Sequence, residues 1–116
     1  MSGADIASLP GWRWCPGLAT LCGHRVTSEE GGVYVHVRQR AGQAWHEVLL
    51  HDPKPDPADP LLPGWLLHLL RERHGAHVLT APAADGSCWA VWGDGRTMAC
   101  EGAELDALAA ALRGSP

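Results

Sequence analysis

The segment HDPKPDPADP, residues 51–60, constrains the fold of this 116-residue chain more than any other feature. Proline lacks a backbone N–H and fixes φ, so four prolines within ten residues exclude a helix or a strand interior. The segment is therefore expected to be an extended connection. It ends in a helix start, with Asp59 as the expected N-cap and Pro60 at the first helical position.

The residues that follow have the pattern of an amphipathic helix. Its apolar stripe comprises Leu62, Trp65, Leu66, Leu69 and Leu70. Basic side chains in the last turn suit the negative end of the helix dipole, and Gly75 is a natural stop. We expect this stripe to be buried against β-strands.

Three strands are expected in each half of the chain. The clearest covers residues 33–38, in which Val33, Val35 and Val37 alternate with polar residues. The other expected strands cover residues 24–28, 45–50, 77–81, 88–92 and 96–100. A short helical turn over residues 6–9, capped by Asp5, and a last helix over residues 103–113 complete the pattern. It predicts a single α+β domain over residues 1–116, with an antiparallel sheet of about six strands and helices on one face.

The two halves of the sequence resemble each other. Leu9-Pro10-Gly11-Trp12 recurs as Leu62-Pro63-Gly64-Trp65, and at the same offset His24 and Thr27 fall on His77 and Thr80. Each half is interpreted as one helix followed by three strands, with residues 9–50 and 62–101 as possible pseudo-repeats. The alternative is that LPGW is a common boundary tetrapeptide and that the match is a coincidence.

Composition and charge exclude several classes of protein. With 46% hydrophobic and 19% charged residues, the chain suits a packed globule and not a disordered protein. A net charge of −4 without a basic cluster disfavours nucleic acid and membrane surfaces as partners. The start MSGADIASLP does not resemble a signal peptide, and no stretch approaches the roughly 20 apolar residues of a membrane span. We expect a cytoplasmic protein that needs no cofactor.

Cysteine and histidine residues suggest one possible metal site. Cys15, Cys22 and His24 are the candidate ligands, and a small structural zinc domain is therefore one alternative. Six residues separate the two cysteines, however, whereas zinc knuckles place about two to four between ligands. Ordinary packing of reduced cysteines explains the same residues.

Cys88 and Cys100 flank the expected hairpin loop Gly93-Asp94-Gly95. With a three-residue loop they oppose each other, and a disulfide is conceivable; with a two-residue loop Cys100 opposes Trp89 instead. Because a cytoplasm is reducing, free thiols are the preferred prediction.

No catalytic arrangement is recognisable among the seven histidines. The sequence contains neither the zinc-protease spacing nor a Gly-x-Ser-x-Gly nucleophile elbow. Cys15 or Cys22 with a distant histidine leaves a small Cys/His enzyme as a second alternative. The six tryptophans are expected to fill the core in the absence of phenylalanine. Trp89 and Trp92 point to opposite faces of one strand, so one of them is a candidate anchor for a protein partner.

Three segments carry a resemblance: LPGWRWCPGL (residues 9–18), PDPADP (residues 55–60) and GWLLHLLRE (residues 64–72). They resemble small uncharacterised proteins encoded by phages and prophages of GC-rich bacteria, which often have PGM near the start and a DDPAT-G-LL-LLRE helix entry. The chain departs at Leu18, where the family usually has Met, and at residues 59–62, where it has Thr. The shared motifs are turns and a helix cap, without catalytic residues. The resemblance implies an accessory protein of a mobile element, and we expect it to be non-enzymatic and to act through another protein.

Overall fold

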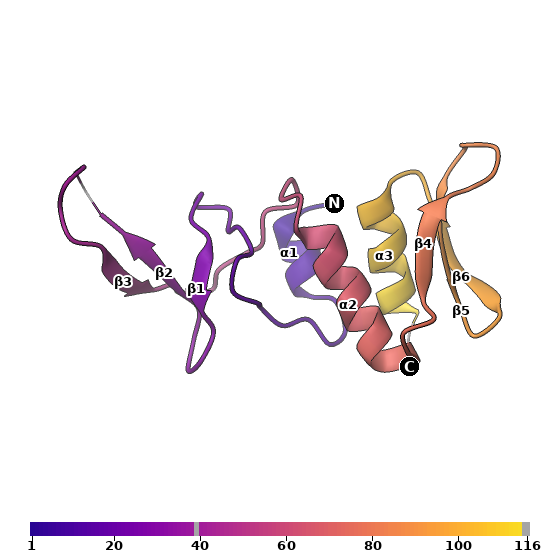
Figure 1. Cartoon of the computed structure of the whole chain (residues 1–116), viewed down its shortest axis with the longest axis horizontal. Coiled ribbons are helices and arrows are strands. Elements are labelled where there is room, and N and C mark those ends of the chain that lie inside the picture. Colours follow the sequence, from indigo (N-terminus) through magenta and orange to yellow (C-terminus); the bar gives the residue numbers. More distant parts are fainter. Residues whose placement is uncertain (39, 115–116) are drawn as a thin grey trace.

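The computed structural model describes residues 1–38 and 40–114, which form an elongated molecule of 52 × 28 × 22 Å. The radius of gyration is 16.1 Å, whereas a compact chain of this length has about 13 Å. A first sheet, three helices and a second sheet follow one another along the long axis (Figure 1). The elements are α1 (Gly3–Ala7), β1 (Val26–Ser28), β2 (Tyr34–Val37), β3 (His46–Leu49), α2 (Leu62–His74), β4 (Leu79–Pro82), β5 (Trp89–Gly93), β6 (Arg96–Glu101) and α3 (Glu104–Arg113).

The predicted α+β class is confirmed, and the six strands form two separate three-stranded antiparallel sheets. Their orders are β1-β2-β3 and β4-β5-β6, so the single sheet of about six strands that the sequence predicted does not form. The helices explain why, because all three lie between the two sheets (Figure 1). Helix α3 packs on the second sheet, and α2 packs on the other side of α3.

The main hydrophobic core is built by the helices and one face of the second sheet. Helix α2 buries Leu62, Leu66, Leu69 and Leu70, which are four of the five residues of the predicted stripe; Trp65 is partly buried. Ile6, Leu9 and Leu18 from the N-terminal segment and Val91 from β5 join the same cluster. The predicted burial of the helix is thus confirmed, with the difference that its main partner is α3.

The two copies of LPGW adopt different backbone conformations. The first forms a turn after α1, with Gly11 at φ 75°, whereas the second opens α2. The tetrapeptide therefore carries no common local structure. Both halves do contain a three-stranded meander, and a duplication remains a prediction.

The starts of α1 and α2 differ from the sequence prediction by three and two residues, respectively. Helix α1 begins at Gly3 behind a capping box: the Asp5 N–H donates to the Ser2 hydroxyl (3.1 Å), and the Ser2 N–H donates to the Asp5 carboxylate (3.0 Å). Ser2 and not Asp5 is the N-cap. Helix α2 begins at Leu62 and not at Pro60, and its N-cap is Leu61 and not Asp59. No helix in the described part of the chain is long and apolar enough to span a membrane.

The buried Asp59 side chain links the proline-rich connection to the segment before β1. We call its contacts with Ala19, Arg25 and Leu61 the Asp59 clasp. The Asp59 carboxylate accepts hydrogen bonds from the backbone N–H of Leu61 (3.1 Å) and Ala19 (2.8 Å), and lies 3.3 Å from the Arg25 guanidinium. Its side chain is only 1% exposed. Residues 59 and 19 are far apart in sequence, so the clasp fixes the root of the first sheet to the start of α2.

These contacts make the stability of the fold depend on pH through Asp59. Burial raises the pKa of Asp59, but the N–H groups of Ala19 and Leu61 and the Arg25 guanidinium outweigh burial, so the pKa lies below its ordinary value of 3.8. A carboxyl group with a lowered pKa stabilises the folded state above its unfolded pKa, and this contribution is lost as the pH falls through the folded pKa.

We expect Asp59→Asn to lower the free energy of unfolding by about 1–3 kcal/mol at neutral pH, because the buried donors lose a charged acceptor. The difference from the natural protein should shrink below about pH 4. Urea denaturation at about pH 7 and about pH 3 measures both values. Asp56→Asn is the matched control, since Asp56 accepts one local hydrogen bond from Ala58. An equal loss at both pH values would contradict the role of the charge.

Candidate functional site

The structure does not bring the three candidate metal ligands together. Cys15 is partly buried against the core, and its thiol donates a hydrogen bond to the Pro16 carbonyl. Cys22 is exposed, and its sulfur lies 2.8 Å from the hydroxyl of Thr20. Within residues 1–38 and 40–114, no three His, Cys, Asp or Glu side chains are grouped so that they could hold a metal ion. Cys15, Cys22 and His24 therefore do not have the geometry to bind one metal ion together.

Cys15 is also poorly placed as a nucleophile. Burial raises the pKa of its thiol, and the negative charge of Glu29 raises it further, against a smaller opposing effect of Arg13. The thiolate is the reactive form of cysteine, so a raised pKa lowers the reactive fraction at neutral pH.

Cys88 and Cys100 form a disulfide, so the prediction of free thiols at these positions is wrong. The hairpin loop has two residues, since Gly93 pairs with Arg96, and a register shift follows in the ladder. Cys100 therefore lies opposite Ala90, and Cys88 is its diagonal neighbour on the same face. The two Cα atoms are 6.2 Å apart, a separation that a disulfide can bridge. Considering directly opposite residues alone misses this diagonal pair.

The two candidate anchor tryptophans lie on opposite faces of β5, as expected. Trp89 is half-buried against the core, whereas Trp92 is 36% exposed on the face away from α3. Leu79 pairs with Trp92 and is also exposed, and the disulfide lies on this outer face. Trp92 is thus a surface residue, in a small apolar strip at one end of the molecule.

The largest group of exposed apolar side chains lies at the other end, on a projecting hairpin. We call this hairpin the arm; it consists of β2, β3 and their flanking residues (33–38 and 40–50). All four residues of β3 are exposed. Trp45 is 56% exposed, Leu49 57% and Val48 40%. Figure 1 shows the arm extending away from the helices. Apolar side chains that would normally be buried are therefore exposed to solvent on this hairpin.

One face of the arm is a ladder of cross-strand pairs. Tyr34 lies opposite Leu49, and His36 lies opposite Glu47, with 3.9 Å between the imidazole and the carboxylate. At the end of the ladder the Arg38 guanidinium stacks over the Trp45 ring at 4.5 Å from its centroid. This cation–π contact holds a large aromatic side chain in a fixed position while it remains accessible to solvent.

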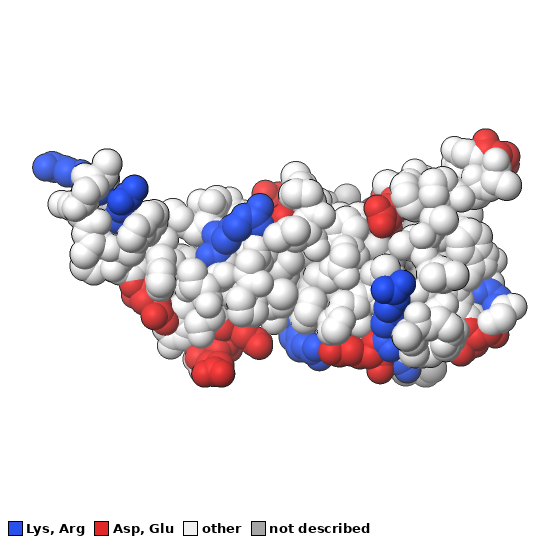
Figure 2. All heavy atoms as spheres, viewed as in Figure 1, with Lys and Arg blue, Asp and Glu red and all other residues white. Residues whose placement is uncertain are grey.

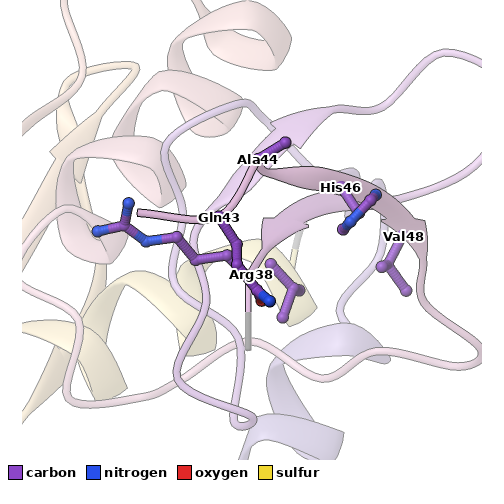
Figure 3. A pocket seen from close by; sticks show the side chains of 6 residues that line it. Arg38, Gln43, Ala44, His46 and Val48 are labelled. Carbon is purple, nitrogen blue, oxygen red and sulfur yellow. The ribbon is translucent and has the colours of Figure 1, made fainter. Parts of the chain in front are cut away.

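The opposite face carries a shallow hollow of about 540 Å³. It is lined by Val37, Arg38, Gln43, Ala44, His46 and Val48. His46 and Val48 lie side by side on β3 at its rim (Figure 3). Three of the six lining residues are apolar and three are polar or charged, so the hollow can receive a side chain through both apolar contacts and hydrogen bonds.

The free end of the arm is positively charged in an otherwise acidic protein. Figure 2 shows basic side chains at this end of the molecule and acidic side chains nearer its root. Arg38 and Arg40 are the basic residues of the arm, and Glu47 is its one acidic residue among those described. The net charge of the whole chain is −4, so the arm has the opposite sign to the rest.

Sequence reasoning placed residues 45–50 in a sheet and did not identify the arm as a site. A signal was present: Trp45 and Leu49 fall on one face of the strand, and Val48 and Leu50 on the other. Apolar residues on both faces indicate a strand that is either covered on both sides or bound by something else. No family model, curated protein or solved structure matches the chain.

We expect reduction of the Cys88–Cys100 disulfide to lower the free energy of unfolding by about 2–3 kcal/mol, because the cross-link closes a short loop in the unfolded chain. Urea denaturation with and without dithiothreitol measures this effect. The double variant Cys88→Ser/Cys100→Ser should be insensitive to the reductant, which separates this pair from Cys15 and Cys22. Titration of four free thiols in the air-oxidised protein would contradict the disulfide.

Proposed function

We propose that this protein is a non-enzymatic binding protein that contacts another protein through the arm. The observation that carries the proposal is the exposure of Trp45, Val48 and Leu49 on a hairpin that lies outside the main core. Exposed apolar groups clustered in this way mark interaction sites more often than chance. Tryptophan and arginine are also the residues most enriched among those that dominate binding energy at interfaces.

The arm is suited to binding because its central side chains are ordered before a partner arrives. Arg38 holds Trp45 through the cation–π contact, and His36 faces Glu47 across the ladder. A side chain that is already fixed loses less conformational entropy on association. The structure thus offers a preorganised anchor beside a hollow.

The alternatives receive less support from the geometry. A zinc domain needs converging ligands, which Cys15, Cys22 and His24 do not provide. A Cys/His enzyme needs an activated nucleophile, and the partly buried thiol of Cys15 has a raised pKa. A binding role requires only the surface already described.

We further propose that the protein is an accessory factor of a phage or prophage in the cytoplasm of a bacterial host. Its support is the resemblance in residues 9–18, 55–60 and 64–72. The arm lies at the opposite end of the molecule from the second sheet (Figure 1), which carries the Cys88–Cys100 disulfide, so binding through the arm does not require that disulfide.

Photocrosslinking from the arm tests this proposal. A photoreactive amino acid at Gln43, which lines the hollow, should capture a specific protein in bacterial cells, identified by mass spectrometry. Trp45→Ala should reduce capture roughly tenfold or more, because it removes the anchor. Leu61→Ala is the matched control, since Leu61 is a 54% exposed apolar residue outside the arm. Capture that Trp45→Ala leaves unchanged, or no product above background, would refute the arm as the binding site.

A further inference from the structure

We propose that the partner contributes an extended acidic segment, which adds to the free edge of β3 as a fourth strand of the first sheet. This inference rests on the function proposed above and specifies the kind of partner and how it binds. Strand addition uses backbone hydrogen bonds for affinity and alternate side chains for specificity. The arm offers the structural elements for both.

The backbone of β3 has hydrogen-bonding groups that point away from β2. The Leu50 N–H donates to the Val33 carbonyl at 2.8 Å, so this pair is hydrogen-bonded. Hydrogen-bonded and non-hydrogen-bonded pairs alternate along an antiparallel ladder. In the observed register the N–H and C=O groups of Glu47 and Leu49 therefore face the outer edge. Within the described chain no strand pairs with that edge.

The edge of β3 differs from the other three sheet edges because it lacks protection. A register shift interrupts the pairing of β1, and another interrupts that of β6. Strand β4 contains Pro82, which has no N–H to donate. Strand β3 pairs with β2 in an unbroken register and contains no proline. Bulges and prolines are the usual means by which proteins block unwanted strand pairing, so their absence here favours pairing.

The charge of the arm indicates an acidic partner. Arg13, Arg25 and Lys54 each have a carboxylate partner within the chain. Among residues 1–38 and 40–114, no carboxylate forms an ion pair with Arg38 or Arg40. A carboxylate on an added strand would supply the missing counter-charge, while an apolar neighbour on the opposite face would fill the hollow beside Val37 and Val48.

A second copy of this chain satisfies these requirements less well. Its β3 carries a single carboxylate, Glu47, which already faces His36 in its own arm. Its arginines would repeat the positive charge that needs to be neutralised. The observations therefore favour a segment of another protein with alternating acidic and apolar residues.

Synthetic peptides test the inference directly on the full-length protein. The probe is a peptide of alternating Glu and Val, about six residues long, which is the usual length of a strand. It should bind with a dissociation constant below about 1 mM, and binding should weaken as salt is added. Matched peptides of alternating Lys and Val, and of Glu and Val with a central proline, should not bind. Hydrogen exchange followed by NMR should show new protection at the amides of Glu47 and Leu49.

Two substitutions at one position separate backbone pairing from side-chain contact. Glu47→Pro removes an outward N–H and leaves the ladder with β2 intact, so it should weaken binding of the probe about tenfold or more. Glu47→Ala also lacks the carboxylate but keeps the N–H, so it should bind the probe about tenfold or more tightly than Glu47→Pro does. If Glu47→Pro disrupts the arm, as judged by the amide signals of β2, the exchange protection in the natural protein decides instead.

Each remaining outcome has a defined meaning. If the arm still crosslinks a cellular protein but the acidic probe fails, strand addition is refuted and the proposed function stands. If the arm captures no cellular protein and the acidic probe does not bind, strand addition and the proposed function are both refuted. Tighter binding of the Lys–Val peptide or of a single-stranded oligonucleotide would refute the acidic segment. A dimer that Glu47→Pro converts to monomer would assign the edge to a second copy and overturn the inference.

Discussion

The packing of α3 between α2 and the second sheet is the contact on which the rest of the fold depends. Ala107, Leu108, Ala109, Ala111 and Leu112 are all buried, so α3 presents apolar groups in more than one direction. Alanine side chains allow neighbouring backbones to approach closely, and leucines fill the remaining space. The leucines of α2 are covered from this side and by Ile6, Leu9 and Leu18 from the other. Every layer of the main core thus touches one of these two helices.

The first sheet is attached in a different way. Val26 and Val35 are buried, but they lie outside the main hydrophobic cluster. Backbone hydrogen bonds, such as that from the Leu21 N–H to the Lys54 carbonyl at 3.0 Å, and the Asp59 clasp fix the root of this sheet. The proline-rich connection then returns the chain to α2. Hydrogen bonds to the proline-rich connection, together with the burial of Val26 and Val35, therefore hold the root from which the arm projects.

Local patterns in the sequence predicted the elements well and their assembly less well. The spacing of leucines in α2 and the alternation of Val33, Val35 and Val37 each predict burial on one face. The burial of α2 was confirmed, whereas only Val35 of the three valines is buried and the other two are half-buried. Neither pattern says which element covers that face, so the prediction of a single six-stranded sheet was wrong. Asp59 was expected to be the N-cap of α2, but the helix begins at Leu62; the role of Asp59 in bonding to Ala19 was missed because Ala19 belongs to a distant segment. The Cys88–Cys100 disulfide was missed because a register shift in the ladder cannot be read from the sequence. The arm was missed because the exposure of β3 depends on whether another part of the chain packs against it, and the sequence of the strand does not show this.

The attachment of the arm outside the main core has an evolutionary consequence. Substitutions on β3 change side chains that contribute little to the packing of the helices, so the mutational tolerance of this strand should be high. A lineage could therefore alter its recognition sequence in step with a changing target without first acquiring compensating mutations elsewhere. Variation between related chains would then concentrate on this hairpin, while the leucines and alanines of the two long helices stay the same.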